Sequence, residues 1–349
     1  MALALAGADA QAVRTLPWFM REGAWDDAAL RQRHGQEVAT CLGEDAGVRP
    51  LDGRDVRQQG QASVGGTRHY GGEVGKRAHG HAGVSLGEAS RQGDTLGARR
   101  LSVPQAGVAN EAAAARRRRC GVPAALPCKT KPRLGGEMRQ AGHPAGTVRA
   151  RWVACDAALG RDTRLLAPSA GMGLWYCAEV PHAPQVWRHR PAPAGPLWAG
   201  QGRHPTRTRV PAGAIQPAAV APRAASWSAA RGGRRTIQAG RTGPLVAHGA
   251  ARRGSAGRDG WPGPEGWLGL RRHLVTGAWK TSLAKAPADT PLATLGRLRG
   301  MRWPLETCCE DGKHSLGMGD DAVRRWRGWP HPMTRGILAH FLLVRTWLK

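Results

Sequence analysis

The spacing of apolar and polar positions predicts a chain that mixes helices with short strands. Before residue 47 the pattern indicates helix, with candidate core positions at Trp18, Trp25, Leu30, Val38 and Leu42. From residue 47 to 103 it changes to short apolar segments broken by glycine. These segments read SVGGTRHY, HAGVSLG and ARRLSV, an order typical of a hairpin or a meander.

The following segments predict alternating helices and strands up to residue 181. Helices are expected over 111–119 and 130–142, and a strand over 173–180. The stretch VRARWVACD predicts a strand that ends in Asp156, with Val148, Trp152 and Ala154 toward its core side. Residues 182–262 are rich in Pro, Ala, Gly and Arg with little periodicity, which predicts an insertion that is β-rich or poorly ordered.

Near the C-terminus, acidic and basic side chains recur at helical spacing. Arg302, Glu306 and Lys313 lie four and seven residues apart on a helix expected to open at Pro304, so they share one face, with Glu310 close by. A carboxylate flanked by two cations suits a site that handles a metal ion and phosphate. The alternative is a solvated amphipathic helix stabilised by ion pairs within the helix.

The apolar run over 337–344 is too short to span a bilayer, so we expect no membrane partner. It predicts a buried helix packed behind the helix that carries Glu306. Seven cysteines, an odd number, and the lack of a secretory segment indicate a reducing cytoplasm. No C-x-x-C pair occurs, and structural zinc is not expected. Cys155, beside Asp156, is a minor alternative as a nucleophile.

Charge agrees with a nucleic-acid partner without proving one. The chain has 52 Lys+Arg against 25 Asp+Glu, a formal net charge of +27 and a pI near 11.5. Such a field attracts polyphosphate, and affinity should fall steeply with salt. A GC-rich coding bias yields the same Arg, Ala, Gly and Pro content. Only two Phe and two Tyr are present, against 14 Trp, so material for a dense core is limited.

Three separated blocks resemble DDE-type bacterial insertion-sequence transposases of the "IS four"-like superfamily. The C-terminal block contains RWPLET-x-x-E-x-G-K, LGMGD, VR-x-WRGW-x-H-x-MT and ILAHFLLVR. A segment beginning LDGRDVRQQGQASVGG is similar to the first catalytic block of that family. The segment RARWVACDAALGRDTRLL is similar to the second. The similarity runs discontinuously over most of the chain and is strongest after residue 289.

The resemblance implies which residues carry the chemistry. The catalytic and metal-binding carboxylates would be Asp52, Asp156 and Glu306, with Asp55 as a substitute for the first. The DNA-binding residues would be Arg302, Lys313 and Arg161. The implied cofactor is a pair of Mg²⁺ ions, with Mn²⁺ as a substitute. The implied partners are DNA, as transposon ends and target, and a second copy of the chain in a homodimer.

The implied fold is α/β, an RNase-H-like mixed sheet flanked by helices, with a β-rich or poorly ordered insertion between the second Asp and the Glu. We expect four parts: a helical N-terminal remnant over 1–46, the first part of the catalytic core over 47–181, the insertion over 182–285, and a C-terminal helical part of the core over 286–349.

Some positions depart from the family pattern. Arg299 replaces a family Tyr, and Leu159 replaces an aromatic. Arg49 would be buried in the first strand, and Pro50 would remove a ladder donor from it. The sequence therefore predicts a truncated and diverged transposase that cleaves and joins DNA. The alternatives are an inactive remnant that only binds DNA electrostatically, and a largely disordered basic chain without a task.

Overall fold

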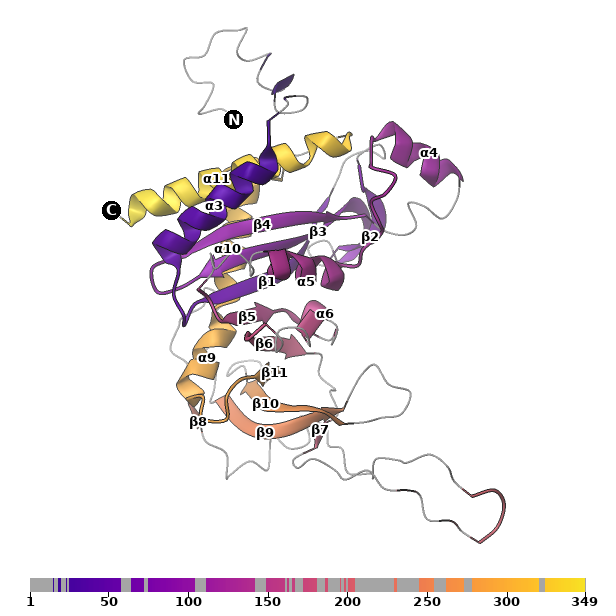
Figure 1. Cartoon of the computed structure of the whole chain (residues 1–349), viewed down its shortest axis with the longest axis vertical. Helices are drawn as coiled ribbons and strands as arrows, with labels where there is room; N and C mark the ends of the chain where they lie inside the picture. Colours follow the sequence, from indigo (N-terminus) through magenta and orange to yellow (C-terminus); the bar gives the residue numbers. More distant parts are fainter. Residues whose placement is uncertain are drawn as a thin grey trace. The chain divides into compact units, whose positions relative to one another are not determined.

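Two groups of strands organise the chain, each within its own compact unit (Figure 1). The first unit comprises residues 1–151 and 303–349, and the second comprises residues 152–302. The computed structural model describes residues 15, 18–19, 23, 25–57, 64–71, 75–103, 111–141, 149–160, 162, 165–166, 172–180, 186–187, 195, 198, 200–204, 229–230, 245–253, 262–272, 278–319 and 324–348.

The first unit is built on an antiparallel meander. The long strand β3 (Lys76–Ala89) pairs along one edge with β1 (Val48–Arg57) and along its other edge with β2 (Thr67–Gly71) and β4 (Asp94–Ser102). The ladder between β1 and β3 pairs Val48 with Ala89 and resumes at Leu51 opposite Leu86. It thus passes over Pro50, which has no N–H to donate.

Helices cover this meander on both faces. Helix α10 (Trp303–His314) packs on β1, β3 and β4, and α5 (Lys131–Ala141) contacts β3 and β4. Helices α3 (Asp27–Leu42) and α11 (Pro330–Trp347) pack against each other and against β4, as the indigo and yellow ribbons show (Figure 1). The unit also contains α4 (Glu111–Arg119) and the 3₁₀ turn η3 (Trp326–Gly328).

The main core of the first unit forms where α10 and α11 meet the sheet. Leu305, Cys308 and Cys309 of α10 pack in one cluster with Leu96 and Leu101 of β4 and with Met333 and Ile337 of α11. At Gly87 of β3, an added Cβ would lie 2.9 Å from Leu305. The glycine therefore lets α10 lie directly on the strand.

The second unit combines a parallel strand pair with an antiparallel extension. Strand β5 (Trp152–Cys155) runs parallel to β6 (Trp175–Val180), and β6 continues antiparallel into β11, β10 and β9. The strands of this unit beyond β6 are β7 (Val186–Trp187), β8 (Ala229–Ala230), β9 (Leu245–Arg253), β10 (Pro262–Arg272) and β11 (Trp279–Lys285). Its helices are α6 (Ala157–Gly160) and α9 (Leu292–Gly300).

The mixed α/β prediction is confirmed. The meander, the helices at 111–119 and 130–142, and the strand ending at Asp156 all form. Trp152 and Ala154 are buried as expected, while Val148 lies outside the described residues. Most of residues 182–262 also lies outside the described residues; its described part contains the strands β7, β8, β9 and the first residue of β10, and a bend over 200–203. The four-part division of the chain stays a prediction.

Some details of the sequence interpretation were wrong. Trp18 and Leu30 are not core residues, since they are 58% and 39% exposed. The predicted core positions Val38 and Leu42 are confirmed, since both are buried and pack on Phe341 of α11. In addition, α10 begins at Trp303, so Arg302 lies in the turn before the helix and not on its face. The expected helix over 337–344 is confirmed as part of α11, which packs on α10, but it is not buried throughout, because Leu342 and Leu343 are exposed.

Candidate active site

Asp52 lies on the face of the meander that α10 covers. It is 8% exposed and directly opposite Ser85 in the ladder between β1 and β3. Side chains of directly opposed residues point to the same face of a sheet. Burial raises the pKa of the Cys309 thiol of α10, while the nearby Ser85 hydroxyl lowers it and nearby Asp52 raises it. Ser85 and Asp52 therefore both face the helix.

Glu306 belongs to the same helix, one turn before Cys309. Residues three apart on a helix are neighbours on its surface, so Glu306 flanks the position that faces Asp52. Its side chain is partly buried. One turn further along, Glu310 accepts a hydrogen bond of 3.2 Å from Arg54 of β1. Helix α10 thus carries Glu306 and Glu310 on the surface of the first unit to which β1 contributes Arg54.

Asp55 points the other way. It is an odd number of residues from Asp52 on a strand whose pairing with β3 continues without a bulge between them. Alternate residues of a strand point to opposite faces. Its carboxylate accepts a hydrogen bond of 2.6 Å from Lys131 of α5, the helix on the opposite face. Of the two acidic candidates at the first block, only Asp52 faces α10.

Asp156 occupies the end of β5 in the second unit. Its Oδ1 accepts a hydrogen bond of 2.9 Å from the backbone N–H of Leu159, and its carbonyl accepts one of 2.7 Å from Gly160. The carboxylate is therefore the cap of the short helix α6. At Gly160 an added Cβ would lie 2.0 Å from the Glu179 carbonyl oxygen of β6, so glycine is required for α6 to lie on the strand.

Charged groups gather around the thiol of Cys155, next to Asp156. Burial raises the pKa of Cys155, Asp156 raises it further, and Arg302 lowers it. These effects require Asp156 and Arg302 to lie near the same thiol within the second unit. Because the thiol stays protonated at neutral pH, a nucleophilic role for Cys155 has no support.

The candidate carboxylates are thus divided between the two units, with Asp52 and Glu306 in the first and Asp156 in the second. Within the described ranges, no group of three or more His, Cys, Asp or Glu side chains is gathered as a metal centre. The donor chemistry of the three acids nevertheless suits a hard divalent cation, which prefers carboxylate oxygens.

A family model described as DDE superfamily endonuclease matches residues 1–242. The chain belongs to this family. The matched residues include Asp52 and Asp156 and end before Glu306. DDE superfamily endonucleases generally use divalent metal ions, and the family implies DNA as the substrate. No curated protein matches the chain.

Membership of the DDE superfamily endonucleases confirms the fold class expected from the resemblance. An antiparallel meander, a helix and then a parallel strand pair follow one another in the order of an RNase-H-like fold, and helices flank the mixed sheet. Among the described helices, none is both long enough and apolar enough to cross a bilayer.

The sequence interpretation missed some neighbours of the candidate residues, and one of its candidates lies outside the described structure. Arg54 was not singled out, although it lies two residues after Asp52 on β1 and therefore faces α10 as Asp52 does. Glu179, which also affects the pKa of Cys155, was missed because nothing in its local sequence distinguishes it. Arg161 lies outside the described residues.

Proposed function

We propose that this DDE superfamily endonuclease is an insertion-sequence transposase, which cleaves phosphodiester bonds and transfers DNA strands with the help of Mg²⁺. The observation that carries the proposal is the direction of Asp52. It lies on the sheet face covered by the helix that contains Glu306, whereas Asp55 is held by Lys131 on the opposite face. The proposal needs one catalytic carboxylate from β1 and one from α10, and Asp52 and Glu306 are these two.

In this proposal Asp52, Asp156 and Glu306 hold the divalent ions. Bound ions would activate the attacking oxygen and stabilise the leaving oxygen at phosphorus. The protein side chains have supporting roles. Arg302 and Lys313 would orient DNA phosphates, and Arg161 would add a further phosphate contact. Arg54, bonded to Glu310, would limit the repulsion between the acidic side chains of α10 and Asp52.

The proposed chemistry can be tested by nicking of supercoiled DNA with Mg²⁺ or Mn²⁺. We expect cleavage by the unaltered chain and at least about 100-fold less by Glu306→Gln, since even outer residues of metal sites contribute about 10–100-fold. Glu310→Gln is the matched control on the next turn, and it should keep most of the activity because Glu310 is 55% exposed and bonded to Arg54. Equal activity of Glu306→Gln and the unaltered chain would exclude the role of Glu306.

The second candidate function is DNA binding without catalysis. It is favoured by the net charge of +27 and by a helix, α4, that ends in four consecutive arginines. In that case metal ions would not lead to cleavage of the DNA, and the affinity for DNA would depend on salt alone.

Homodimer formation and a cytoplasmic location are further parts of the proposal. Sedimentation of the protein with and without transposon-end DNA tests the formation of a homodimer.

A further inference from the structure

The first unit contains a cavity of about 650 Å³ that is not part of the proposed catalytic surface. It lies between α3, α5, α11 and the face of β3 and β4 that carries Leu86 and Glu88. Asp52 and Glu306 do not line it. Because neighbouring strand residues point to opposite faces, Leu86 and the Asp52 partner Ser85 face away from each other. The wall formed by Leu86 and Glu88 therefore lies on the face opposite to Asp52, while Arg99 and Leu101, which also line the cavity, come from the alternate positions of β4.

The size and walls of this cavity suit a small molecule. Binding pockets for such ligands are mostly about 300–1,000 Å³ and are apolar with a few polar groups. Its apolar wall includes Leu86, Leu101, Met138, Met333 and Ile337, which come from the sheet, α5 and α11. All five are buried. The wall is thus fixed by packed elements and does not depend on a loop.

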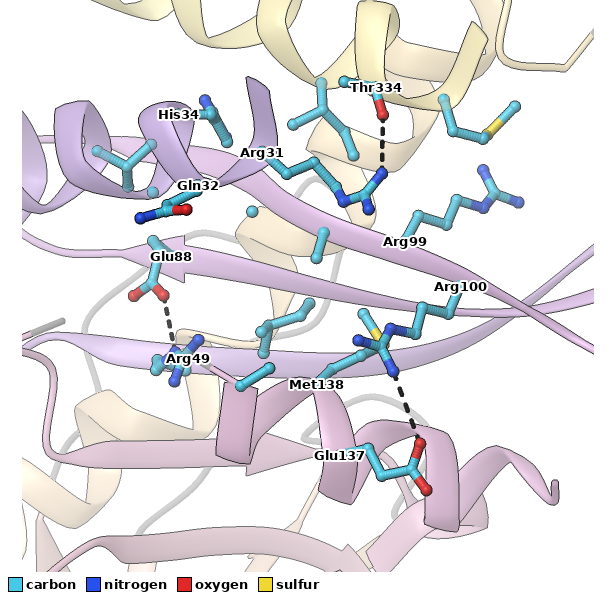
Figure 2. Close-up of a pocket in the computed structure, with 18 of the residues that line it drawn as sticks. Arg31, Gln32, His34, Arg49, Glu88, Arg99, Arg100, Glu137, Met138 and Thr334 are labelled. Carbon is cyan, nitrogen blue, oxygen red and sulfur yellow. Dashed lines mark hydrogen bonds and ion pairs between the residues drawn. The ribbon is translucent and has the colours of Figure 1, made fainter. Parts of the chain in front are cut away.

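Cations outnumber acids in the lining of the cavity. The cationic residues are Arg31, Arg49, Arg99, Arg100, Lys129 and Arg149, and the acidic ones are Asp27, Glu44, Glu88 and Glu137. Figure 2 shows Arg31 on α3 and Arg100 on β4 among the residues that line the cavity, with the Arg100 side chain directed toward Glu137 and that of its neighbour Arg99 directed away from it. Since most of the acids are already neutralised by close cationic partners, the excess of positive charge in the lining favours an anion.

Among the described residues, Arg100 has only a long ion pair with a carboxylate that it shares with other cations. The nitrogen of Arg100 is 3.6 Å from the carboxylate of Glu137. That carboxylate also forms ion pairs with Lys129, at 2.7 Å, and with Arg133, at 3.5 Å. By contrast, the buried Arg49 has Glu88 at 2.7 Å. The side chain of Arg100 is 46% exposed, which leaves it accessible from solvent.

Arg31 lies close enough to Arg100 for the two charges to repel. Burial lowers the pKa of Arg31, Arg100 lowers it further, and Asp26 raises it. Arg31 is held by Asp27 and by Thr334 of α11. An anion between the two guanidinium groups would replace this repulsion with two charge-assisted hydrogen bonds.

We propose that this cavity binds a small amphipathic anion, with its charged head between Arg31 and Arg100 and its apolar body against Leu86, Met138 and Ile337. The head is a carboxylate or a phosphate monoester, which the guanidinium fork binds in the same way. This site is additional to the proposed DNA chemistry and does not depend on it.

The binding test uses the fluorescent anion 1-anilinonaphthalene-8-sulfonate on the full chain, with octanoate, octyl phosphate and octanol as competitors. We expect saturable fluorescence that both anions reduce, and the more effective anion identifies the head group. Octanol should compete at least about tenfold less well, because it lacks the charge that the arginines bind. Competition by octanol as strong as that of the anions would overturn the proposal.

Three variants locate the probe. Arg100→Gln should weaken its binding about tenfold. Ala98→Phe, which places a ring in the cavity beside Leu86, should abolish binding. Arg33→Gln is the matched control on α3, because Arg33 is 72% exposed and does not line the cavity; it should bind as the unaltered chain does. If Arg100→Gln also binds the probe unchanged, the dye lies elsewhere, for example on the exposed Leu342, Leu343 and Trp347 of α11, and the proposal fails.

Discussion

Asp52 and Asp55 lie on opposite faces of β1. Asp52 is opposite Ser85 on the face that α10 covers, and Asp55 accepts a hydrogen bond of 2.6 Å from Lys131 of α5. The two acids are only three residues apart in the sequence, and both fit the motif of the first catalytic block. The pleat of the strand separates them, which makes them a matched pair for mutation.

We predict different effects for Asp52→Asn and Asp55→Asn on metal-dependent DNA cleavage. Asp52→Asn should reduce the rate at least about 100-fold, because an amide is a weaker ligand for a hard cation. Asp55→Asn should keep most of the activity and lose at most about 1 kcal/mol of stability with its partly exposed ion pair. Rates of plasmid nicking and urea unfolding of both variants check this, and a reversed order would contradict the assignment of Asp52.

Asp156 has a structural role that can be separated from its proposed catalytic role. Its carboxylate caps α6 through the Leu159 N–H, and asparagine caps a helix about as well as aspartate. Asp156→Asn should therefore change the free energy of unfolding by less than about 0.5 kcal/mol while abolishing metal-dependent cleavage. Circular dichroism melts and nicking assays of one protein preparation measure both. Full cleavage by a stable Asp156→Asn variant would limit this residue to capping.

Gly160 allows α6 to lie directly on β6. Because an added Cβ would lie 2.0 Å from the backbone oxygen of Glu179, Gly160→Ala must displace the helix or the strand. We expect a loss of about 1–3 kcal/mol in the free energy of unfolding, as in other overpacked sites. Gly300→Ala, at the end of α9 with nothing within 4 Å of the added Cβ, is the control and should be neutral or slightly stabilising. Denaturant titration compares the two, and equal stability would contradict the close approach.

Stability of the first unit should decrease below neutral pH because of His34. Its Nε2 donates to the Leu96 carbonyl at 2.9 Å, and its buried Nδ1 has no partner among the described residues. Burial lowers the pKa of His34, the Leu96 carbonyl raises it, and His340 lowers it. Below the ordinary histidine pKa of about 6.5, the unfolded chain therefore binds more protons at His34 than the folded chain does. Stability is lost as the pH falls from there through the lowered pKa of the folded state.

The size of this pH effect has an upper limit. One such histidine changes the free energy of unfolding by at most about 1.4 kcal/mol per pH unit. His34→Gln should reduce the slope between about pH 7 and pH 5, whereas the exposed His314→Gln should not. Urea midpoints across this range provide the measurement. An unchanged slope in His34→Gln would assign the acid sensitivity to other groups.

Periodicity and turn residues were sufficient to predict most local elements. The meander after Asp52, the strand that ends at Asp156, and the helix that carries Glu306 each follow from a short run of apolar side chains between glycines or after a proline. These features are local, so the neighbouring residues determine them. Strand parity was also available from the sequence, and it separates Asp52 from Asp55 once β1 is known to be regular.

Tertiary partners were the part that the sequence could not supply. Arg49 is buried as predicted, but a salt bridge of 2.7 Å to Glu88 compensates it, and Arg49 also donates to the Arg139 carbonyl. The burial of this arginine is therefore not a sign of decay by itself. Glu88 lies on a different strand, and only the ladder between β1 and β3 brings it to Arg49. The arginine-lined cavity likewise depends on packing between elements distant in the sequence.

The central claim is that Asp52, Asp156 and Glu306 share divalent ions. Calorimetric titration with Mn²⁺ tests it most directly on the unaltered chain and on Asp52→Asn, Asp156→Asn, Glu306→Gln and Asp55→Asn. We predict about two ions bound per chain, loss of this binding in each of the first three variants, and its retention in Asp55→Asn. Binding of Mn²⁺ by Asp156→Asn with the same stoichiometry and affinity as the unaltered chain would contradict a site shared by the three acids.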